Sequence, residues 1–385
     1  MKYRALHKKS QFLFLGNTTF GEGFQREHAF AMELGRRGFS VRYVNGIPSF
    51  FSRLQRARST YQKHTADEVS NVEVLTPPMV PTTFRSSWTP TIDQLLFRRW
   101  FSKTFAGWDW PSTTVCVMFP YWWSGFVRKT DIGSARIVYD ICDALLVPSR
   151  TPQALNRMQL AEDLLKDECN VVTCSAHTLQ HEWNSRWPEK HAACITNGVW
   201  STSASRKNSS AAARPMDSII FIGTIDERWV DVELMMHLAG SLPACNVTLV
   251  GEVREQYQRM FSKFSNISCV GPVPHQRVAE LMRHASVGII PFKKNAITDR
   301  VNPIKLYEYA AAGVPIVATR SEELNRLAHI ATLAQTPDEF VKLVGKKLKA
   351  PERERKQLVS WARRNTWERK TDEWLKAIGV AEFRK

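Results

Sequence analysis

The sequence predicts an α/β fold made of two doubly wound domains, each a parallel sheet covered by helices. Short apolar runs alternate with longer segments of helical periodicity along the chain, a pattern typical of buried parallel strands joined by helices. At 385 residues the chain exceeds the usual size of one domain. A polar stretch of small residues at 201–213 separates the halves, as expected of a linker.

The apolar runs give the expected strands and domain limits. They are 12–15, 41–44, 115–119, 137–139, 171–174 and 194–196 in the first half, and 219–222, 247–250, 267–270, 287–290 and 316–318 in the second. We therefore expect an N-terminal domain at 1–198, a linker at 199–216, a second domain at 217–350 and a helical segment at 351–385. Ligands of such sheets bind beyond the carboxyl ends of the strands, here in the cleft between the domains.

The C-terminal segment is charged and has helical periodicity. Trp361, Trp367 and Trp374 follow one another at spacings of six and seven residues, which can bring the three rings onto one broad helix face. That face can pack either on the first domain or on the second.

Composition limits the compartment and the class of protein. No window approaches 18 uninterrupted apolar residues, so no membrane-spanning helix is expected, and the apolar run near the start is too short for a signal peptide. The seven cysteines form no CxxC pair and are expected to be buried free thiols in a reducing compartment. These features favour a cytoplasmic protein.

The formal net charge is +16. Such a charge suits binding to nucleic acid, to an anionic membrane face or to an acidic substrate, or it serves solubility alone. The sequence has no zinc-finger, RNA-recognition or basic-zipper pattern, so nucleic acid is the disfavoured partner.

The segment 302–319 is the most informative part of the chain. Asn302 is expected to cap a helix that starts at Pro303 and ends before Gly313. Free N–H groups at the start of such a helix bind anions, and Lys305 adds a positive charge there. Glu308, about a turn further on, can accept two hydrogen bonds from hydroxyl groups. A nucleotide diphosphate and its ribose fit this arrangement; the alternative is a plain amphipathic helix.

This segment resembles the donor-site motif of GT-B glycosyltransferases, in the group-one, family-four-like branch that includes bacterial surface-polysaccharide enzymes. The resemblance implies that Glu308 binds the ribose of a sugar nucleotide, with Asn302, Ile304 and Lys305 at the diphosphate. It also implies a UDP-linked donor, no metal requirement, and a last helix that crosses back to the first domain.

Two further segments occur in the order expected for that branch. Gly223 and Thr224 end a strand and lead to Arg228, which is placed to neutralise a departing diphosphate, although an ordinary strand–helix turn with a solvated arginine is the alternative. The loop containing Val273 matches one that contacts the base through backbone groups.

One position departs from the family pattern. Many relatives carry a second glutamate eight positions before the one that binds ribose, and that position here is Arg300, beside Asp299. In those relatives the missing glutamate contacts the transferred sugar and is linked to retention of configuration. The stereochemical course is therefore left open.

The acceptor side is expected in the first domain. A glycine-rich turn follows the first strand and leads into a helix, and Gly21, Glu22 and His28 are its candidate substrate contacts. Each of the two side chains is equally compatible with a helix surface.

Two carboxylates follow the strand at 137–139. Apolar neighbours would raise the pKa of either Asp140 or Asp143, which suits a general base that accepts the proton of an acceptor hydroxyl. We favour Asp143 because it lies beyond the strand end; helix capping is the alternative. No metal ligand set is evident, since His177 and His181 are four apart without a third ligand.

Aromatic residues alternate with cations at 91–110, which includes Phe97, Arg99, Trp100 and Lys103. A similar mixture occurs at 50–58, and the aromatic residues at 121–123 either extend that surface or line the cleft. Such segments suit an anionic membrane interface; packing of the aromatic rings in the core is the alternative.

The sequence thus favours a metal-independent glycosyltransferase, peripheral at the inner face of the cell membrane. It would move a sugar from a nucleotide diphosphate donor to a saccharide or lipid-linked acceptor. The alternatives are a GT-B nucleotide-sugar epimerase or hydrolase, and a non-enzymatic basic protein that binds membrane or nucleic acid.

Overall fold

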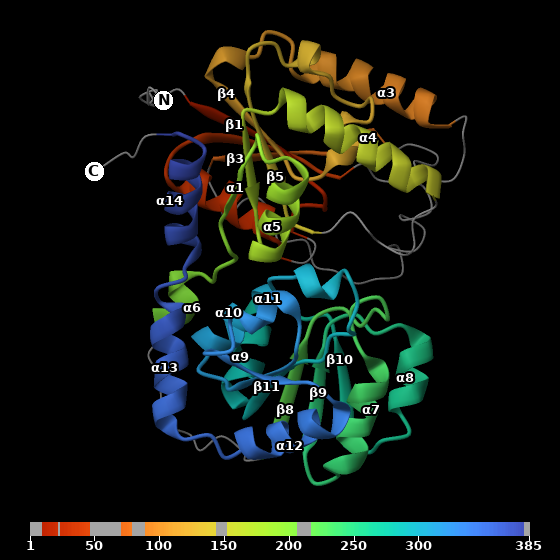
Figure 1. Cartoon of the computed structure of the whole chain (residues 1–385), viewed down its shortest axis with the longest axis vertical. Helices are drawn as coiled ribbons and strands as arrows, with labels where there is room; N and C mark the ends of the chain where they lie inside the picture. Colours follow the sequence, from red (N-terminus) through yellow and green to blue (C-terminus); the bar gives the residue numbers. More distant parts are fainter. Residues whose placement is uncertain are drawn as a thin grey trace. The chain divides into compact units, whose positions relative to one another are not determined.

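The computed structural model describes residues 10–21, 24–46, 71–78, 89–143, 152–205 and 217–380. The chain divides into two compact units (Figure 1). Unit 1 comprises Met1–Ile195 and Thr371–Lys385, and unit 2 comprises Thr196–Lys370. Each unit is a parallel α/β domain, which confirms the expected fold class. The division falls at 195 rather than 198, and the expected linker at 199–216 is part of unit 2.

Unit 1 contains a parallel sheet of seven strands in the order β3-β2-β1-β4-β5-β6-β7. The strands are β1 (Gln11–Leu15), β2 (Ser40–Val44), β3 (Val72–Leu75), β4 (Thr113–Val117), β5 (Arg136–Ile141), β6 (Val171–Cys174) and β7 (Ala192–Cys194). Each expected strand of the first half overlaps an observed one. The edge strand β3 is the one that the apolar pattern did not reveal, because Glu73 interrupts its short run of branched residues.

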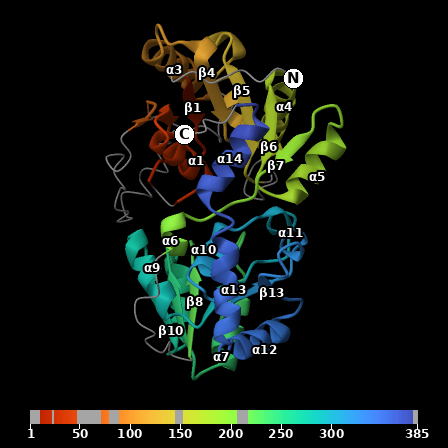
Figure 2. The ribbon, with the colours of Figure 1, turned by 90° about the vertical axis from the view of Figure 1, so that its left-hand side faces the viewer.

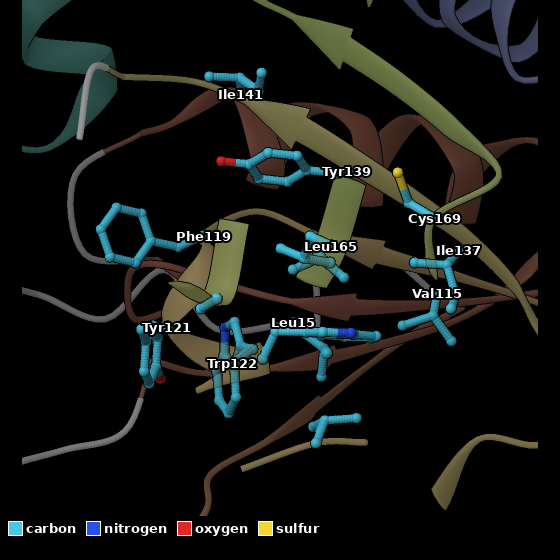
Figure 3. Packing of buried hydrophobic residues seen from close by; sticks show 14 of the residues in the cluster. Leu15, Val115, Phe119, Tyr121, Trp122, Ile137, Tyr139, Ile141, Leu165 and Cys169 are labelled. Carbon is cyan, nitrogen blue, oxygen red and sulfur yellow. The ribbon is translucent and has the colours of Figure 1, made fainter. Parts of the chain in front are cut away.

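Helices and short turns cover this sheet. They are α1 (Arg26–Arg36), α3 (Thr89–Thr104), α4 (Pro152–Glu168), α5 (His177–Arg186), and the 3₁₀ turns η2 (Trp110–Ser112), η3 (Pro120–Trp123) and η4 (Lys129–Asp131). On one face of β1, Leu13 and Leu15 join a core that contains Trp122 and Leu165 (Figure 3). The indole N–H of Trp122 donates to the carbonyl of Gly16 at 3.1 Å, so the turn η3 is tied to the end of β1.

The C-terminal helix α14 (Trp367–Ala377) supplies part of the packing on the other face of β1. Trp374 is fully buried and its ring stacks on that of Phe30 at 5.1 Å between centroids. The same indole lies 6.2 Å from Phe12 and 6.3 Å from Phe14. Helix α14 thus contributes to the packing of unit 1 (Figure 2).

The aromatic residues at 97–105 and 121–123 pack in the core rather than at the surface. Phe97 and Phe101 on the inner face of α3 and Phe105, the residue after the helix, recur every fourth residue, and all three are buried. Phe97 packs on Trp122 at 5.3 Å. The expected aromatic membrane surface is therefore wrong for these rings, and the similar cluster at 50–58 lies outside the described residues.

Unit 2 contains a parallel sheet of six strands in the order β10-β9-β8-β11-β12-β13. The strands are β8 (Ser218–Ile222), β9 (Asn246–Val250), β10 (Ile267–Gly271), β11 (Val287–Ile290), β12 (Ile316–Thr319) and β13 (Ala331–Ala334). Alternate residues of β8 enter two different cores: Ile219 and Phe221 on one face, and Ile220 on the other. The sheet is therefore buried on both faces, as continuous apolar runs predict.

The helices of unit 2 are α6 (Ser201–Ser205), α7 (Val232–Ser241), α8 (Glu255–Phe261), α9 (His275–His284), the 3₁₀ turn η5 (Thr298–Arg300), α10 (Ile304–Ala311), α11 (Glu322–Asn325), α12 (Pro337–Lys347) and α13 (Glu352–Ala362). Trp361 of α13 packs on Tyr307 of α10 at 5.0 Å. The segment from 351 is thus shared between the units. The helices α13 and α14 are separate, because a non-helical segment lies between Ala362 and Trp367. Trp361 and Trp374 therefore do not share one helix face.

Among the described residues, no helix is long and apolar enough to cross a membrane. Cys116, Cys169, Cys174 and Cys245 are buried thiols as expected, whereas Cys269 on β10 is exposed.

A buried ion pair ties α1 to the sheet of unit 1. Arg26 Nε donates to Asp140 Oδ2 at 2.8 Å, and the Thr173 hydroxyl donates to Asp140 Oδ1 at 2.6 Å. Arg26 also donates to the carbonyl of Ile195 at 2.5 Å. Burial alone would lower the pKa of Arg26, but the Asp140 carboxylate outweighs this and raises it. This contact set gives Asp140 a structural role.

We predict that Asp140→Asn destabilises the protein by about 3–5 kcal/mol, because Arg26 would remain buried without its counter-charge. The exposed Asp143→Asn variant is the matched control and should change stability by less than about 0.5 kcal/mol. Urea denaturation of both variants checks this. Equal midpoints for D140N and wild type would contradict the structural assignment.

Asp93 is a second buried carboxylate, on the inner face of α3 one turn before Phe97. Both of its oxygens lack a hydrogen-bond partner within the described ranges. Burial raises the pKa of Asp93 to about 6. The neutral acid is therefore the form that the folded protein favours.

We expect stability to fall as the pH rises from 4 through 6, since the folded state holds a proton that the unfolded chain releases near pH 4. Asp93→Asn cannot ionise. The stability of the wild type relative to D93N should decrease by about 2–3 kcal/mol between pH 4 and pH 7.5. Urea titrations at several pH values measure this difference; a pH-independent difference would show that Asp93 titrates normally.

Candidate active site

The start of α10 differs from the expected capped helix. The helix begins at Ile304, with Pro303 at the N-cap position and no side chain capping it. Asn302 is buried and serves another purpose: its Oδ1 accepts from the Tyr307 hydroxyl at 2.9 Å and from the Asn197 N–H at 3.2 Å. The expectation that Asn302 caps the helix is wrong, because its side chain is held by these neighbours. The first N–H groups of α10 are therefore left without a side-chain cap.

Tyr309 fixes α10 against the sheet. Its hydroxyl accepts from the N–H of Ile222 at 3.0 Å, and lies 3.3 Å and 3.4 Å from the carbonyl oxygens of Ile220 and Ile289. The ring packs directly on Gly288, where an added Cβ would lie 2.7 Å from the ring. The strands β8 and β11 that Tyr309 bridges are the neighbours at which the strand order reverses. Ligands of doubly wound sheets bind beyond the carboxyl ends at this point.

Lys305 lies at that end, one turn before Tyr309 on α10. Its Nζ sits over the rings of Phe221 and Phe292, at 4.7 Å and 5.5 Å from their centroids. No acceptor in the described part of unit 2 lies within hydrogen-bond distance of this ammonium group. Burial lowers the pKa of Lys305 to about 8, and the charge of Glu308 opposes part of that shift. A positive group in this setting gains from an anionic ligand.

Gly223 allows the close approach that the sequence predicts. It follows β8 with φ of +138°, and an added Cβ would lie 2.7 Å from Lys305 Nζ. An added Cβ on Gly251, after β9, would lie 2.3 Å from the carbonyl oxygen of Gly223. A side chain at either position would displace its neighbour. Thr224 is exposed beside this turn.

Arg228 belongs to a group of two arginines on one carboxylate. Its Nε donates to Asp226 Oδ1 at 2.8 Å, and Arg254 Nη2 donates to Asp226 Oδ2 at 3.3 Å. The hydrogen bonds from Arg228 lower the pKa of Asp226. With Asp226 ionised, the group carries one net positive charge. Arg228 is thus held in place by Asp226, which the sequence alone did not single out.

The loop of Arg228 is joined to the loop after β11. Asn295 donates to the carbonyl of Arg228 at 3.0 Å, and the N–H of Lys293 donates to the carbonyl of Trp229 at 2.9 Å. These bonds hold Arg228 and the chain after Phe292 at the same edge of the sheet. Asp299 accepts from the N–H of Glu322 at 3.3 Å and so stabilises the start of α11.

The remaining donor-side candidates are partly exposed. Ile304 and Glu308 lie on α10, with Glu308 one turn after Lys305. Val273 follows β10 and packs against the core that contains Tyr309. The structure therefore brings Lys305, Gly223 and Glu308 together on α10 and the adjoining turn, whereas Val273 lies on the loop after the edge strand.

In unit 1, the turn after β1 is built around Glu27. The buried carboxylate of Glu27 accepts from the N–H and hydroxyl of Thr18, at 2.9 Å and 2.6 Å, and from the Tyr43 hydroxyl at 2.5 Å. His28 is also buried: its Nε2 lies 3.1 Å from the Thr18 hydroxyl, and its Nδ1 accepts from the N–H of Gln25 at 3.3 Å. His28 thus supports the turn from inside.

Gly21 lies at the exposed end of this turn with φ of +83°, and Glu22 lies outside the described residues. Asp143 follows β5 and is exposed, in contrast to the buried Asp140. Of the two aspartates, Asp143 is therefore the one that a substrate can reach. No group of three His, Cys, Asp or Glu side chains suited to a metal ion occurs in the described ranges.

Sequence reasoning missed Tyr309, Asp226 and Glu27. Tyr309 lies in the motif that drew attention, and its position one residue after Glu308 was the available signal. Asp226 precedes Arg228 by two residues, a spacing that permits a local ion pair. Glu27 gives no comparable sign, because its partners Thr18 and Tyr43 are nine and sixteen residues away.

Comparison with known proteins shows similarity to glycosyltransferases in the second half of the chain. Residues 228–376 match the model of a family described as glycosyl transferase-like. A curated relative from Bacillus subtilis (strain 168), assigned to teichuronic acid biosynthesis as the glycosyltransferase TuaH, is 24% identical over 225 residues. This match covers 54% of the present chain and 56% of the relative, so the chain spans about half the length of that protein.

Solved structures match over nearly the whole chain. Anabaena HepE, crystallised with UDP and glucose, superposes with a TM-score of 0.69 at 13% identity, covering 95% of this chain and 98% of its own. WaaG, a glycosyltransferase involved in lipopolysaccharide biosynthesis, gives a TM-score of 0.66 at 14% identity, covering 96% and 99%. The chain thus has the fold of these solved proteins, and residues 228–376 are similar in sequence to the glycosyl transferase-like family.

Proposed function

We propose that the protein transfers a sugar from a nucleotide diphosphate sugar, with UDP as the nucleotide, to a saccharide or lipid-linked acceptor in polysaccharide assembly. UDP is suggested by the crystals of HepE, which contain it. Polysaccharide assembly is suggested by the assignment of TuaH.

One observation carries this proposal. Lys305 holds an ammonium group over two aromatic rings at the end of β8, beside the uncapped start of α10. Helix N–H groups and a desolvated cation together favour a dianionic or trianionic ligand. A diphosphate supplies that charge, and the absence of a side chain on Gly223 leaves room for it beside Lys305.

These groups would act on the bond that breaks. As the glycosidic bond to the donor phosphate lengthens, negative charge builds on the departing diphosphate. Lys305 and the N–H groups of α10 are already in place, so they stabilise this charge without reorganisation. The positive group formed by Arg228, Arg254 and Asp226 adds attraction from the neighbouring turn.

Glu308 would select the nucleoside. A carboxylate can accept two hydrogen bonds from the adjacent ribose hydroxyls, and hydrogen bonds to a charged acceptor contribute about 1.5–3 kcal/mol each. Its position one turn beyond Lys305 on the same helix suits a ribose that follows the diphosphate.

In an inverting reaction, Asp143 would take the proton of the acceptor hydroxyl. Its exposure at the end of β5 makes it accessible to an acceptor bound to unit 1. The proposal assigns the positive charge at the diphosphate to protein groups and includes no metal.

Calorimetry with UDP, GDP, dTDP and ADP tests the donor site. We expect the wild type to bind UDP most tightly, and Glu308→Ala to lose about 100-fold or more in affinity through the two lost ribose hydrogen bonds. Glu322→Ala, an exposed glutamate on α11, is the matched control and should bind as the wild type does.

Failure of folded wild-type protein to bind any nucleotide would overturn the proposal. If the Glu308 and Glu322 variants bound UDP with equal affinity, Glu308 would not contact the nucleotide. Hydrolysis of UDP-glucose at an unchanged rate with and without acceptors would point to a hydrolase instead.

The pKa of Lys305 predicts a pH dependence of nucleotide binding. Above pH 8 the free protein increasingly loses the ammonium charge, so binding must take up a proton. UDP affinity should therefore fall about tenfold between pH 7 and pH 9. Lys305→Arg keeps its charge over this range and should show a flat profile, while Lys305→Met should bind weakly at both pH values. Parallel profiles for wild type and K305R would refute the role of Lys305.

A further inference from the structure

We propose that the outward face of α3 is a docking site for an anionic membrane surface. This inference rests on unit 1 alone and does not depend on the proposed transferase activity. It assigns membrane contact to aliphatic and basic residues, in place of the aromatic residues that the sequence suggested.

The helix α3 has two apolar faces. Phe97 and Phe101 extend from the inner face into the core, where Phe105, the residue after the helix, joins them. The outward face carries Ile92, Leu95 and Leu96, which are 56%, 70% and 43% exposed. Their spacing of three and four residues places them side by side over one turn. Figure 1 shows α3 at the outside of unit 1.

A contiguous group of exposed apolar side chains is uncommon on the surface of a soluble protein. Single exposed leucines need no explanation, but a contiguous apolar group indicates an interaction site. Within the described residues, the large apolar side chains that are clearly exposed are Ile92, Leu95, Leu96, Leu160, Leu164 and Val270. Three of these six lie on two adjacent turns of α3.

The charge along the same face identifies the partner. Arg99 and Lys103 are exposed and continue the face of Leu95 and Leu96 by one and two turns. Neither has an ion-pair partner in the described part of unit 1. The one acid of α3, Asp93, is buried on the opposite side. An apolar group next to unpaired cations matches the boundary between acyl chains and anionic headgroups.

The alternative occupant would be a second copy of the chain. Each copy carries a net charge of +16, and a twofold contact through α3 would bring unpaired cations into the same interface. Repulsion opposes that contact and favours an anionic partner.

Helix α4 provides a matched control. It also exposes two leucines one turn apart, Leu160 and Leu164. Its polar neighbours there include Asp163 and Asp167, which form ion pairs with Arg186 and Lys166. Non-specific adsorption would use both leucine pairs equally, whereas the proposed docking site uses the pair on α3.

Co-sedimentation with vesicles tests the proposal. The probes are phosphatidylcholine vesicles with and without phosphatidylglycerol, at low and physiological salt. We expect the full chain to bind the anionic vesicles alone, and Leu95→Ser/Leu96→Ser to lower the partition coefficient at least tenfold. Arg99→Gln/Lys103→Gln should lower it about thirtyfold, since each cation contributes about fivefold, and should reduce its salt dependence.

Three controls accompany these variants. Leu160→Ser/Leu164→Ser on α4 and Arg353→Gln/Lys356→Gln on α13 remove the same groups elsewhere and should bind as the wild type does. Thermal melting of each variant verifies folding. Nucleotide affinity, measured separately, should be unchanged in the α3 variants.

Absence of binding to anionic vesicles would overturn the proposal, as would equal losses in the α3 and α4 variants. A dimer in light scattering that the α3 substitutions convert to a monomer would assign the face to a second copy and would also overturn it.

Discussion

The hydroxyl of Tyr309 is the interaction on which the candidate site depends. It is hydrogen-bonded to backbone groups of β8 and β11, so the helix α10 has one position relative to the two strands where the order of the sheet reverses. Lys305 and Glu308 are carried by that helix, one turn and one residue before Tyr309. Gly288 is needed for the same contact. A side chain at this position would collide with the Tyr309 ring and would displace α10 from the sheet. A preorganised anion site requires this rigidity, since stabilisation of a departing group depends on groups that do not have to move.

The two units differ in how a buried cation is compensated. In unit 1 the guanidinium of Arg26 meets a carboxylate, a carbonyl and the face of Phe30, so its charge is fully compensated within the fold. In unit 2 the ammonium of Lys305 lies over rings, with Glu308 on the next turn as its electrostatic neighbour. The first arrangement stabilises the positions of α1 and β5. The second keeps a cation poorly solvated, which is the condition under which an incoming anion gains most.

The sequence predicted most of the sheets but could not separate the roles of similar residues. Continuous apolar runs marked most strands, whereas two edge strands escaped: β3, whose short run is interrupted by Glu73, and β13, which has four residues of which two are alanines. Asp140 and Asp143 looked alike as residues after a strand, yet one is buried against Arg26 and the other is exposed. The same ambiguity affected α3: its helical period was visible, but aromatic and aliphatic residues both recur at that period, and only packing against Trp122 decided which set faces inward.

By itself the sequence determined the fold class, which follows from local periodicity. Turn chemistry, residue type and the family resemblance together gave Lys305, Glu308, Gly223 and Arg228 as candidates and the expected order of the donor-side segments. The tertiary structure alone decided that Asn302 is bound by Asn197 and Tyr307, that Asp226 holds Arg228, and that Trp361 and Trp374 belong to different cores. The contact of Asn302 with Asn197 and the ring contacts of the tryptophans join residues tens to hundreds of positions apart, which leaves no trace in local periodicity. Asp226 and Arg228 are only two positions apart, and there the folded side-chain geometry decides that the ion pair forms.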